Sequence, residues 1–333
     1  MKIHILFQFK HGPFGGGNQF LRVLKEEFKK MGVYEERKER ADAILFNSHH
    51  HLKQAFCLKN KFPKKVFIHR IDGPIFNYRK KEKFFDKAIF DINKLLADIT
   101  VFQSLWCFKE NKKYFSYPSD SKIILNAGDP IFNQQGKKPF DQNKIKLIAV
   151  SWSSNWLKGF DIYKYLDENL NFSKYEMSFV GNTPIKFKNI KTIPPVCSEE
   201  LSKILKQYDI FIQASKTEAC SNALIEGISS GLPVVAFNAT SNPEVVNKGG
   251  ELFNSKEDVI DKIEKVVKNY KYYQDNLPIF SIKDKAEEYY NIILGYQNIN
   301  NKKINFTKKL KFLILEAIVL IHKIINKICL KKH

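Results

Sequence analysis

The stretch Ser215 to Pro233 reads SKTEACSNALIEGISSGLP and holds two carboxylates, Glu218 and Glu226, with seven residues between them. It follows a strand-like run, Asp209 to Ala214, and leads into another, Val234 to Phe237. This order predicts a strand-to-helix loop that carries Glu218 and a helix that carries Glu226. In open α/β sheets, ligands bind at that edge. Taken alone, the spacing also allows an acid/base pair of the kind that cleaves glycosides.

Apolar runs of strand length alternate with helical patterns on both sides of this stretch. Most of these runs are uninterrupted, which is typical of strands buried on both faces of a parallel sheet. A polar segment, residues 133–143, separates two such series and has the composition of a linker. The sequence therefore predicts an α/β protein of two doubly wound units, an N-terminal domain over residues 1–135 and a C-terminal domain over 144–295.

The expected elements follow from these patterns. Strands are expected over Lys2–Phe9, Ala43–Asn47, Lys65–Ile71, Ile99–Gln103 and Lys122–Leu125, and then over Lys146–Ser151, Glu176–Val180, Lys191–Ile193, Asp209–Ala214, Val234–Phe237 and Gly250–Phe253. Helices are expected over Gln19–Met31, Lys256–Asn269, Ile282–Gly295 and Ser198–Gln207, where Ser198 is the predicted N-cap.

Composition and cysteine usage indicate a globular, intracellular protein. The chain has 333 residues, of which 44% are hydrophobic and 14% aromatic, and this excludes a disordered chain. Its five cysteines lack metal-ligand spacing and are odd in number, as in a reduced, cytoplasmic chain. The apolar run at the N-terminus is too short for a signal peptide and fits a first strand instead.

The net charge of +20 is carried almost entirely by lysine, with 50 lysines and 5 arginines. Specific contacts to nucleic-acid bases favour the bidentate fork of arginine, so a nucleic-acid partner is not expected. A lysine-rich surface fits an anionic membrane better. The alternative, a basic nucleic-acid binder, would show steeply salt-dependent binding to DNA or RNA.

Part of the charge is concentrated in the tail, Lys302 to His333, which holds nine lysines and one glutamate. The apolar runs of the tail are too short for a spanning helix. On a helical wheel, Lys309, Glu316, Lys323 and Lys327 share one narrow stripe, and most other positions are apolar. The pattern predicts a basic amphipathic helix in the membrane interface. Packing against the protein body, or against another chain, is the alternative.

Three further segments follow predicted strands at the ligand edge. The glycine-rich Gly15-Gly16-Gly17 precedes a helix, where glycines let a backbone approach a ligand and the helix N-terminus attracts anions; a tight turn without a ligand fits equally well. His69, Arg70 and Asp72 end another strand. Lys158, beside Gly159, is a cation that could bind a phosphate. The alternative is that Lys158 is a solvated loop lysine.

The opening stretch can hold a nucleotide diphosphate. Ser221 can cap the helix, so that the N–H groups of Asn222, Ala223 and Leu224 point at an anion. Glu226 could accept hydrogen bonds from the vicinal hydroxyls of a ribose, and Glu218 from those of a sugar.

Together these features resemble the retaining glycosyltransferases of family 4. The resemblance spans about residues 1–295 and is carried by E-x7-E in EACSNALIEGISSGLPVV, KG in WLKGFD, the glycine loop GGGNQF, FIHRIDG and NAGDPIF. It implies the GT-B fold, two Rossmann-like domains that face a central cleft, with the acceptor bound mainly by the first domain and the donor by the second.

The resemblance also implies residue roles. Glu226 would bind the donor ribose and Glu218 would lie near the transferred sugar, while Lys158 would neutralise the leaving diphosphate. His69 would sit by the reacting sugar. Gly15, Gly16 and Gly17 would lie near the donor phosphate and the acceptor. Arg70 and Asp72 would lie on the acceptor side. The family often has an arginine where this chain has the donor-side residue Ser153, so either Lys158 carries more of the phosphate charge or another cation substitutes for the arginine.

The expected activity is transfer of a sugar from a nucleotide diphosphate donor to a glycan or lipid-linked acceptor, with retention of configuration and without a metal or other cofactor. The enzyme would work in cell-surface polysaccharide synthesis as a cytoplasmic, peripheral protein on the inner face of the cell membrane. Two alternatives share the donor: a nucleotide-sugar epimerase, and a non-catalytic membrane-associated protein that binds nucleotide sugars.

Overall fold

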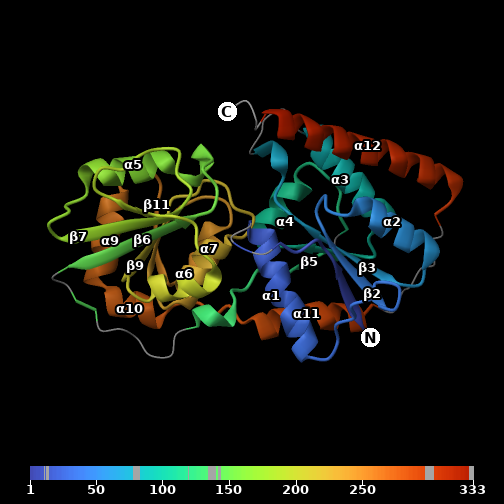
Figure 1. Ribbon diagram of the computed structural model, residues 1–333, viewed down its shortest axis with the longest axis horizontal. Coiled ribbons are helices and arrows are strands. Elements are labelled where there is room, and N and C mark those ends of the chain that lie inside the picture. The colour runs from blue at the N-terminus through green and yellow to red at the C-terminus, as the bar shows by residue number, and fades with distance from the viewer. Residues whose placement is uncertain are drawn as a thin grey trace. The chain divides into compact units, whose positions relative to one another are not determined.

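The computed structural model describes residues 1–10, 12, 15–77, 83–118, 120–133, 140–141, 144–296 and 304–329 of the chain (Figure 1). The chain divides into two compact units. The first comprises Met1–Gln8, Leu24–Leu125 and Lys283–His333, and the second comprises Phe9–Val23 and Asn126–Ile282. This division differs from the expected boundaries, because residues 9–23 group with the second unit and residues 283–295 with the first. Most of the expected linker lies outside the described residues.

The first unit contains a parallel sheet whose strands, as far as they are described, follow the order β1-β2-β3-β4-β5. The expected strands are present with shortened ends. Ladder pairing of β1 with β2 stops at Leu6 and Phe46, so Phe7 and the residues after it leave the sheet. The strands are β1 (Ile3–Leu6), β2 (Ala43–Asn47), β3 (Val66–Ile71), β4 (Ile99–Phe102) and β5 (Lys122–Ile123).

Helices surround this sheet. They bury apolar side chains in the core, as Leu24 and Phe28 on the first helix show, whereas residues 16–23 of that helix group with the second unit. The helices are α1 (Gly16–Lys30), α2 (Leu52–Lys61), α3 (Lys83–Leu96), α4 (Leu105–Lys112), α11 (Ile282–Leu294) and α12 (Phe306–Cys329), with a short turn of 3-10 helix, η1 (Ile75–Asn77).

The second unit contains a parallel sheet with the order β11-β10-β9-β6-β7-β8 among its described strands. The chain runs outward from β6 through β7 to β8 and then returns to β9 on the other side of β6. This reversal makes the junction of β6 and β9 the topological switch point, where doubly wound sheets bind ligands. The strands are β6 (Ile145–Ser151), β7 (Tyr175–Gly181), β8 (Lys191–Ile193), β9 (Ile210–Gln213), β10 (Val234–Phe237) and β11 (Gly250–Phe253).

The helices of the second unit are α5 (Phe160–Asn169), α6 (Ser198–Leu205), α7 (Asn222–Ser229), α8 (Asn242–Val246), α9 (Val259–Lys268) and α10 (Tyr270–Asp275), with η2 (Pro130–Phe132) and η3 (Trp156–Lys158). The expected N-cap of α6 is wrong by one residue. Cys197 occupies the cap position, and Ser198 is the first helical residue. The Ser198 hydroxyl instead accepts a hydrogen bond from Gln19 Nε2 at 2.7 Å.

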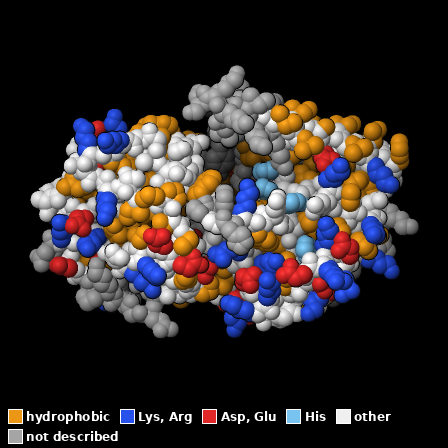
Figure 2. All heavy atoms as spheres, viewed as in Figure 1, with side chains coloured by type: hydrophobic (Ala, Val, Ile, Leu, Met, Phe, Trp, Pro, Cys, Tyr) orange, Lys and Arg blue, Asp and Glu red, His pale blue; other side chains and the backbone are white. Residues whose placement is uncertain are grey.

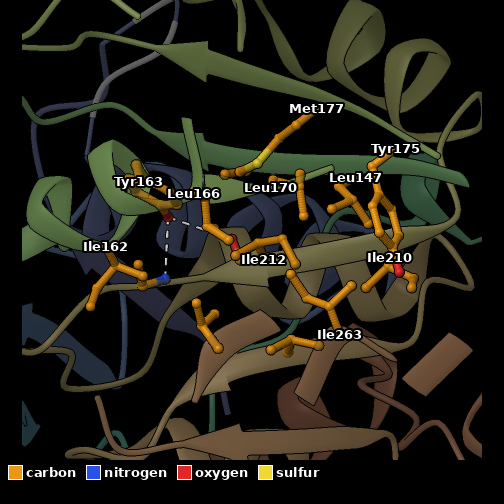
Figure 3. Close-up of a cluster of buried hydrophobic side chains, with 14 of the residues drawn as sticks. Leu147, Ile162, Tyr163, Leu166, Leu170, Tyr175, Met177, Ile210, Ile212 and Ile263 are labelled. Atoms are coloured by element: carbon orange, nitrogen blue, oxygen red, sulfur yellow. Dashed lines mark hydrogen bonds between the residues drawn. The ribbon is translucent and has the colours of Figure 1, made fainter. Parts of the chain in front are cut away.

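The core of the second unit positions the strand ends (Figure 3). Leu147 and Ile212 from the sheet pack with Leu166 from α5, all of them fully buried. Tyr163 is also buried, and its hydroxyl accepts a hydrogen bond from Ala214 N at 3.2 Å. The same hydroxyl lies 3.5 Å from the carbonyl of Ile212. This anchors the end of β9 just before the loop that carries Glu218.

The tail helix α12 runs along α3 in the first unit (Figure 1). Phe312 stacks on Phe56 of α2, with ring centroids 4.0 Å apart, and His322 stacks on Phe85 of α3 at 4.0 Å. The helix therefore packs against the protein body, which was the alternative to a purely interfacial helix. Across the described part of the chain, no helix is both long enough and apolar enough to span a bilayer.

Candidate active site

A cavity of about 420 Å³ lies in the second unit. Its volume is within the range of small-molecule sites. It extends along the carboxyl ends of β6, β7, β8 and β9 and is also lined by residues at the start of α1. The lining residues used below are Lys10, Gly15, Gly16, Gln19, Arg22, Trp152, Ser153, Lys158, Val180, Gly181, Pro195, Val196, Glu199, Glu218, Asn222, Ala223 and Glu226.

Lys158 and Glu218 meet in this cavity. Lys158 Nζ donates to Glu218 Oε1 at 2.6 Å, and both side chains are largely buried. Glu218 is itself held by its backbone, since its N–H donates to Thr240 Oγ1 at 3.0 Å. The two loops that flank the switch point thus place a cation and a carboxylate side by side.

The glycine after Lys158 is required for this arrangement. Gly159 has φ +87°, and a Cβ at this position would lie 2.1 Å from the carbonyl oxygen of Ala214. Only glycine tolerates both the left-handed backbone and the close approach. The loop also pairs directly with the next strand end, because Lys216 N donates to Leu157 O at 2.9 Å. The glycine of the KG motif is therefore required for the loop to pack against Ala214, and this packing places Lys158 beside Glu218.

The N-terminus of α7 opens into the same cavity. Ser221 is its N-cap, as predicted, and its side chain accepts from Leu224 N at 3.3 Å. This hydrogen bond engages one of the three N–H groups expected to face an anion, and Leu224 is fully buried. Asn222 and Ala223 remain at the open end of the helix and line the cavity.

Asn222 also links α7 to the glycine-rich segment. Its Nδ2 donates to Gly16 O at 2.6 Å, and its Oδ1 accepts from Asn126 Nδ2 at 2.8 Å. Asn126 belongs to the NAGDPIF segment. These hydrogen bonds place the start of α1 against the N-terminus of α7.

The glycine segment is more helical than the sequence indicates. The helix starts at Gly16 rather than at Gln19. Gly15 and Gly16 line the cavity, whereas Gly17 lies in the first turn and is not among the lining residues. Asn18 secures the turn by bonding Lys10 on both sides: its Oδ1 accepts from Lys10 N at 2.9 Å, and its Nδ2 donates to Lys10 O at 3.1 Å.

Glu226 lies deep in the cavity, with 8% of its surface exposed. Burial, and secondarily the negative charge of Asp129, raise the pKa of its carboxyl to about 8. Desolvation disfavours the charged form of a carboxylate, so Glu226 is largely protonated at pH 7. In that state its side chain can both donate and accept hydrogen bonds.

Two lining residues of α1 escaped the sequence analysis. Arg22 Nη2 donates to Asp129 Oδ2 at 3.2 Å, and Gln19 bonds Ser198 as described above. The available signal was composition: Arg22 is one of only five arginines in a chain with 50 lysines. Ser153 lines the cavity as expected, and its Oγ accepts from Asn155 N at 3.3 Å.

The strand-end residues of the first unit are more buried than expected. His69 is 0% exposed. Its Nε2 donates to Ser48 O at 2.9 Å, and its Nδ1 accepts from Asn93 Nδ2 at 3.1 Å. Burial lowers the pKa of the imidazole to about 4, so it is neutral at pH 7. Both ring nitrogens are engaged inside the unit, and the ring has no surface that a sugar could contact directly.

Arg70 and Asp72 differ in accessibility. Arg70 is 0% exposed, and its Nη1 donates to Asn47 Oδ1 at 2.6 Å. The Asp72 side chain is 37% exposed and lies 3.7 Å from Arg70 Nη1. Gln103 Nε2 also donates to Asp72 Oδ1. Arg70 is thus a structural neighbour of Asp72, which reaches the surface.

A metal centre is not evident in the described residues. None of their His, Cys, Asp and Glu side chains form a group of three or more that could hold a metal ion.

Comparison with known proteins supports the sequence resemblance. Residues 172–269, which include Glu218 and Glu226, match the family described as "Glycosyl transferases group 1". Protein CapJ of Staphylococcus aureus is 30% identical over 159 residues, which cover 41% of this chain and 39% of that protein. The GtfA subunit of the UDP-N-acetylglucosamine–peptide N-acetylglucosaminyltransferase of Streptococcus pneumoniae is 28% identical over 156 residues, covering 43% of this chain and 31% of that protein. The aligned regions thus span less than two fifths of the length of these curated relatives.

The fold is shared more widely. Anabaena HepE, solved in complex with UDP and glucose, superposes with a TM-score of 0.70 and 13% identity, covering 89% of this chain and all of that one. At this identity the likeness concerns the fold alone. With its two Rossmann-like parallel sheets the chain has the GT-B fold, and the region around its two glutamates, residues 172–269, is similar to the glycosyl transferases group 1 family.

Proposed function

We propose that the protein is a retaining glycosyltransferase that moves a sugar from a nucleotide diphosphate donor to a glycan or lipid-linked acceptor. The observation that carries this proposal is the convergence of Lys158, Glu218, Glu226 and the N-terminus of α7 in one cavity at the switch point. A nucleotide sugar has a matching set of groups in a row: sugar hydroxyls, a diphosphate and ribose hydroxyls.

The diphosphate is the leaving group, and negative charge develops on it in the transition state. The site lowers the activation barrier mainly by stabilising this charge. Lys158 is held in place by its neighbouring glycine and by Glu218, so little reorganisation is needed during reaction. The N–H groups of Asn222 and Ala223 add the partial positive charge of a helix N-terminus. Glu218 keeps its ion pair with Lys158 and also accepts hydrogen bonds from the transferred sugar.

Glu226 holds the ribose in this proposal. Its protonated carboxyl, which the burial described above favours, offers one donor and one acceptor to vicinal hydroxyls. Neutrality also matters for the diphosphate, because an ionised Glu226 would add to the negative charge of Glu218 and Glu199 in the same cavity. We assign Lys10 and Arg22, the other basic residues that line the described cavity, to compensation for the serine at position 153.

The donor nucleotide is proposed to be UDP. Support comes from two relatives: GtfA is named for UDP-N-acetylglucosamine, and HepE was solved with UDP and glucose. Lys158, Glu218 and the N-terminus of α7 make no contact that would select a base, so this assignment rests on the relatives.

The acceptor is proposed to bind mainly through the first unit. There Asp72 is the exposed carboxylate at the end of β3, and buried Arg70 holds it in place. We propose His69 as a positioning residue, because its ring supports the carbonyl of Ser48, a residue with φ 44° at the end of β2.

The tail helix is proposed to attach the enzyme to the cytoplasmic face of an anionic membrane, consistent with a role in cell-surface polysaccharide synthesis. While Phe312, Leu315, Val319 and His322 are buried, α12 carries a second apolar face that is exposed (Figure 2). The residues of this exposed face are Phe306, Leu310, Leu313, Ile314, Leu320, Ile321 and Ile324, between 49% and 81% exposed. The lysines of the tail supply charge complementary to anionic headgroups.

A screen of donors tests the function. Purified protein is unfolded thermally with UDP-, GDP-, ADP- and CMP-sugars, and a bound donor raises the midpoint by mass action. We expect the UDP-sugars to do so, and transfer to a glycan or lipid-linked acceptor to yield product with the anomeric configuration of the donor, measured by NMR. Interconversion of the donor without acceptor would instead identify an epimerase. Binding without any turnover would identify a binding protein.

A further inference from the structure

The loop that follows β6 crosses the ligand edge of the second sheet from one side of the strand to the other. At its start, Trp152 O accepts from Asn182 Nδ2 at 2.6 Å, and Asn182 follows β7. At its end, Leu157 O accepts from Lys216 N at 2.9 Å, and Lys216 follows β9. Trp152 therefore lies on the β7 side of the cavity, and the Lys158–Glu218 pair lies on the β9 side.

The loop between these ends is held by hydrogen bonds of its own. Ser151 Oγ donates to Ser153 O at 2.9 Å, and Asn155 Oδ1 accepts from Leu157 N at 2.9 Å. Gly181, at the end of β7, has φ +129°, and a Cβ there would lie 1.8 Å from Ser151 O. The backbone that presents Trp152 is thus fixed before any ligand binds, which reduces the entropy lost on binding.

This loop carries two half-exposed tryptophans in different surroundings. Trp152 is 48% exposed and lines the cavity. Trp156 is 53% exposed, packs edge-on against Phe160 at 6.3 Å, and is not among the lining residues. An indole that stays half exposed beside a binding cavity offers an apolar planar surface to a ligand.

The orientation of the bound donor decides which part of it contacts the indole of Trp152. If the diphosphate and sugar lie at Lys158 and Glu218, the nucleoside extends toward β7 and β8. The cavity there is lined by Val180, Gly181, Pro195 and Val196, which are apolar or small. An apolar lining beside an indole suits a planar aromatic ring better than a diphosphate or a polyhydroxylated sugar.

We propose that Trp152 stacks on the nucleobase of the donor and is a binding residue of the nucleoside end of the cavity. This inference rests on the proposed function, since the direction of the donor follows from the roles of Lys158 and Glu218. Stacking is tolerant of base identity because every base has a π-face. Trp152 therefore supplies affinity for the nucleoside, and selection among bases falls to hydrogen-bonding groups elsewhere.

The test measures binding of UDP, which contains the base and the diphosphate but no sugar, by isothermal titration calorimetry. Trp152→Ala should weaken UDP binding roughly 5- to 150-fold, the range for loss of one base–aromatic stack. Trp152→Phe should recover a large part of the affinity. Trp156→Ala is the matched control and should bind UDP like the wild type. Each variant is first compared with the wild type by thermal unfolding.

Fluorescence provides a second readout that does not depend on a change in affinity. The chain has three tryptophans, and stacking on a base quenches indole emission. Saturating UDP should quench the wild type and Trp156→Phe, whereas Trp152→Phe should lose most of the quenching.

Three results would overturn the inference. Unchanged UDP affinity in Trp152→Ala, with weaker binding only of the complete nucleotide sugar, would place the indole at the sugar. Equal losses in Trp152→Ala and Trp156→Ala would indicate a general effect on the loop. A wild-type protein that binds no nucleoside diphosphate would overturn the proposed function together with this inference, whereas the first two results leave the proposed function intact.

Discussion

Lys158 Nζ lies 2.6 Å from Glu218 Oε1, and the two residues belong to the loops after β6 and β9, the strands between which the sheet reverses its order. Sixty residues of sequence separate them. The first loop packs against the start of the second through Gly159 and Ala214, and the second is fixed by Thr240 on the Glu218 backbone. The cation expected at the diphosphate and the carboxylate expected at the sugar therefore form one preorganised unit.

Replacing Lys158 by methionine should lower kcat by about 100- to 1000-fold, because one fixed charge aimed at the leaving group is lost. The measurement is initial rate at saturating donor. Lys216→Met is the matched control, since Lys216 forms a similar ion pair with Asp161 at 2.5 Å and does not appear among the cavity-lining residues. Comparable losses in both variants would show that the effect is not specific to the cavity.

Gly159→Ala should reduce both stability and activity. The Cβ of the alanine would collide with Ala214 O, and the alanine would have to adopt a left-handed backbone. We therefore expect the free energy of unfolding to fall by several kcal/mol. If the loop relaxes to relieve the collision, the loss should be about 1–3 kcal/mol. Urea unfolding measures it. Gly231→Ala is the control, because Gly231 has φ +82° but open space around its Cβ position, and it should lose only about 1 kcal/mol. Equal losses would mean that the collision is absorbed without cost.

Glu226 should make the protein less stable as the pH rises. Its folded pKa of about 8 lies above the ordinary value of 4.5, so between these values the folded state binds a proton that the unfolded state has released. Linkage then requires the free energy of unfolding to fall across that window, with the stabilisation present below pH 4.5 and lost above about pH 8. Thermal unfolding of Glu226→Gln, which stays neutral, should show a smaller fall between pH 6 and 9. Parallel profiles for variant and wild type would refute a raised pKa.

His69 should act at the opposite end of the pH scale. Its folded pKa of about 4 lies below the ordinary value of 6.5, so the unfolded state binds the extra proton between these values. The free energy of unfolding should therefore be fully maintained above pH 6.5 and should fall as the pH drops toward 4. His69→Gln should flatten this acid limb in a pH series of thermal unfolding. If the acid side of the pH profile is the same in His69→Gln and the wild type, other groups cause the loss of stability in acid.

The exposed face of α12 should determine membrane binding. Leu313→Glu with Ile321→Glu leaves the buried face of the helix intact but places charge where apolar side chains would enter a bilayer. We expect the double variant to lose co-sedimentation with vesicles of anionic lipid, as should a chain that ends before Lys302. Ile279→Glu is the control, because Ile279 is 90% exposed in the second unit. Retained binding by the double variant would exclude this face as the attachment site.

The α/β alternation was predictable because consecutive apolar runs and helical periodicity are local properties of the chain. All of the expected strands appear. Some of them end earlier than expected, for example at Leu6 and Ile123, because the end of a strand depends on pairing with a neighbouring strand. The cap at Ser221 was predictable for the same reason. The cap of α6 was not, since Cys197 occupies the cap position and the Ser198 hydroxyl bonds the distant Gln19 instead.

In the site, Lys158, Glu218 and Glu226 were recognisable from spacing and from their place after strands. Arg22, Gln19 and Trp152 were not, because nothing local marks an arginine on a helix or a tryptophan in a loop as part of a cavity. His69 shows the converse, since its position after a strand suggested exposure and its surroundings bury it completely.

By itself, the sequence of this protein determined the two α/β units, the strand-to-helix loop with its paired glutamates, and an amphipathic tail, because these follow from residue periodicity and spacing. Tertiary structure alone decided that Lys10, Gly15, Gly16, Gln19 and Arg22 line the cavity of the second unit, that burial keeps Glu226 protonated and His69 neutral, and that the tail packs one apolar face and exposes the other. The reason is that desolvation and contact depend on which distant segments meet, and that is settled only when the chain has folded.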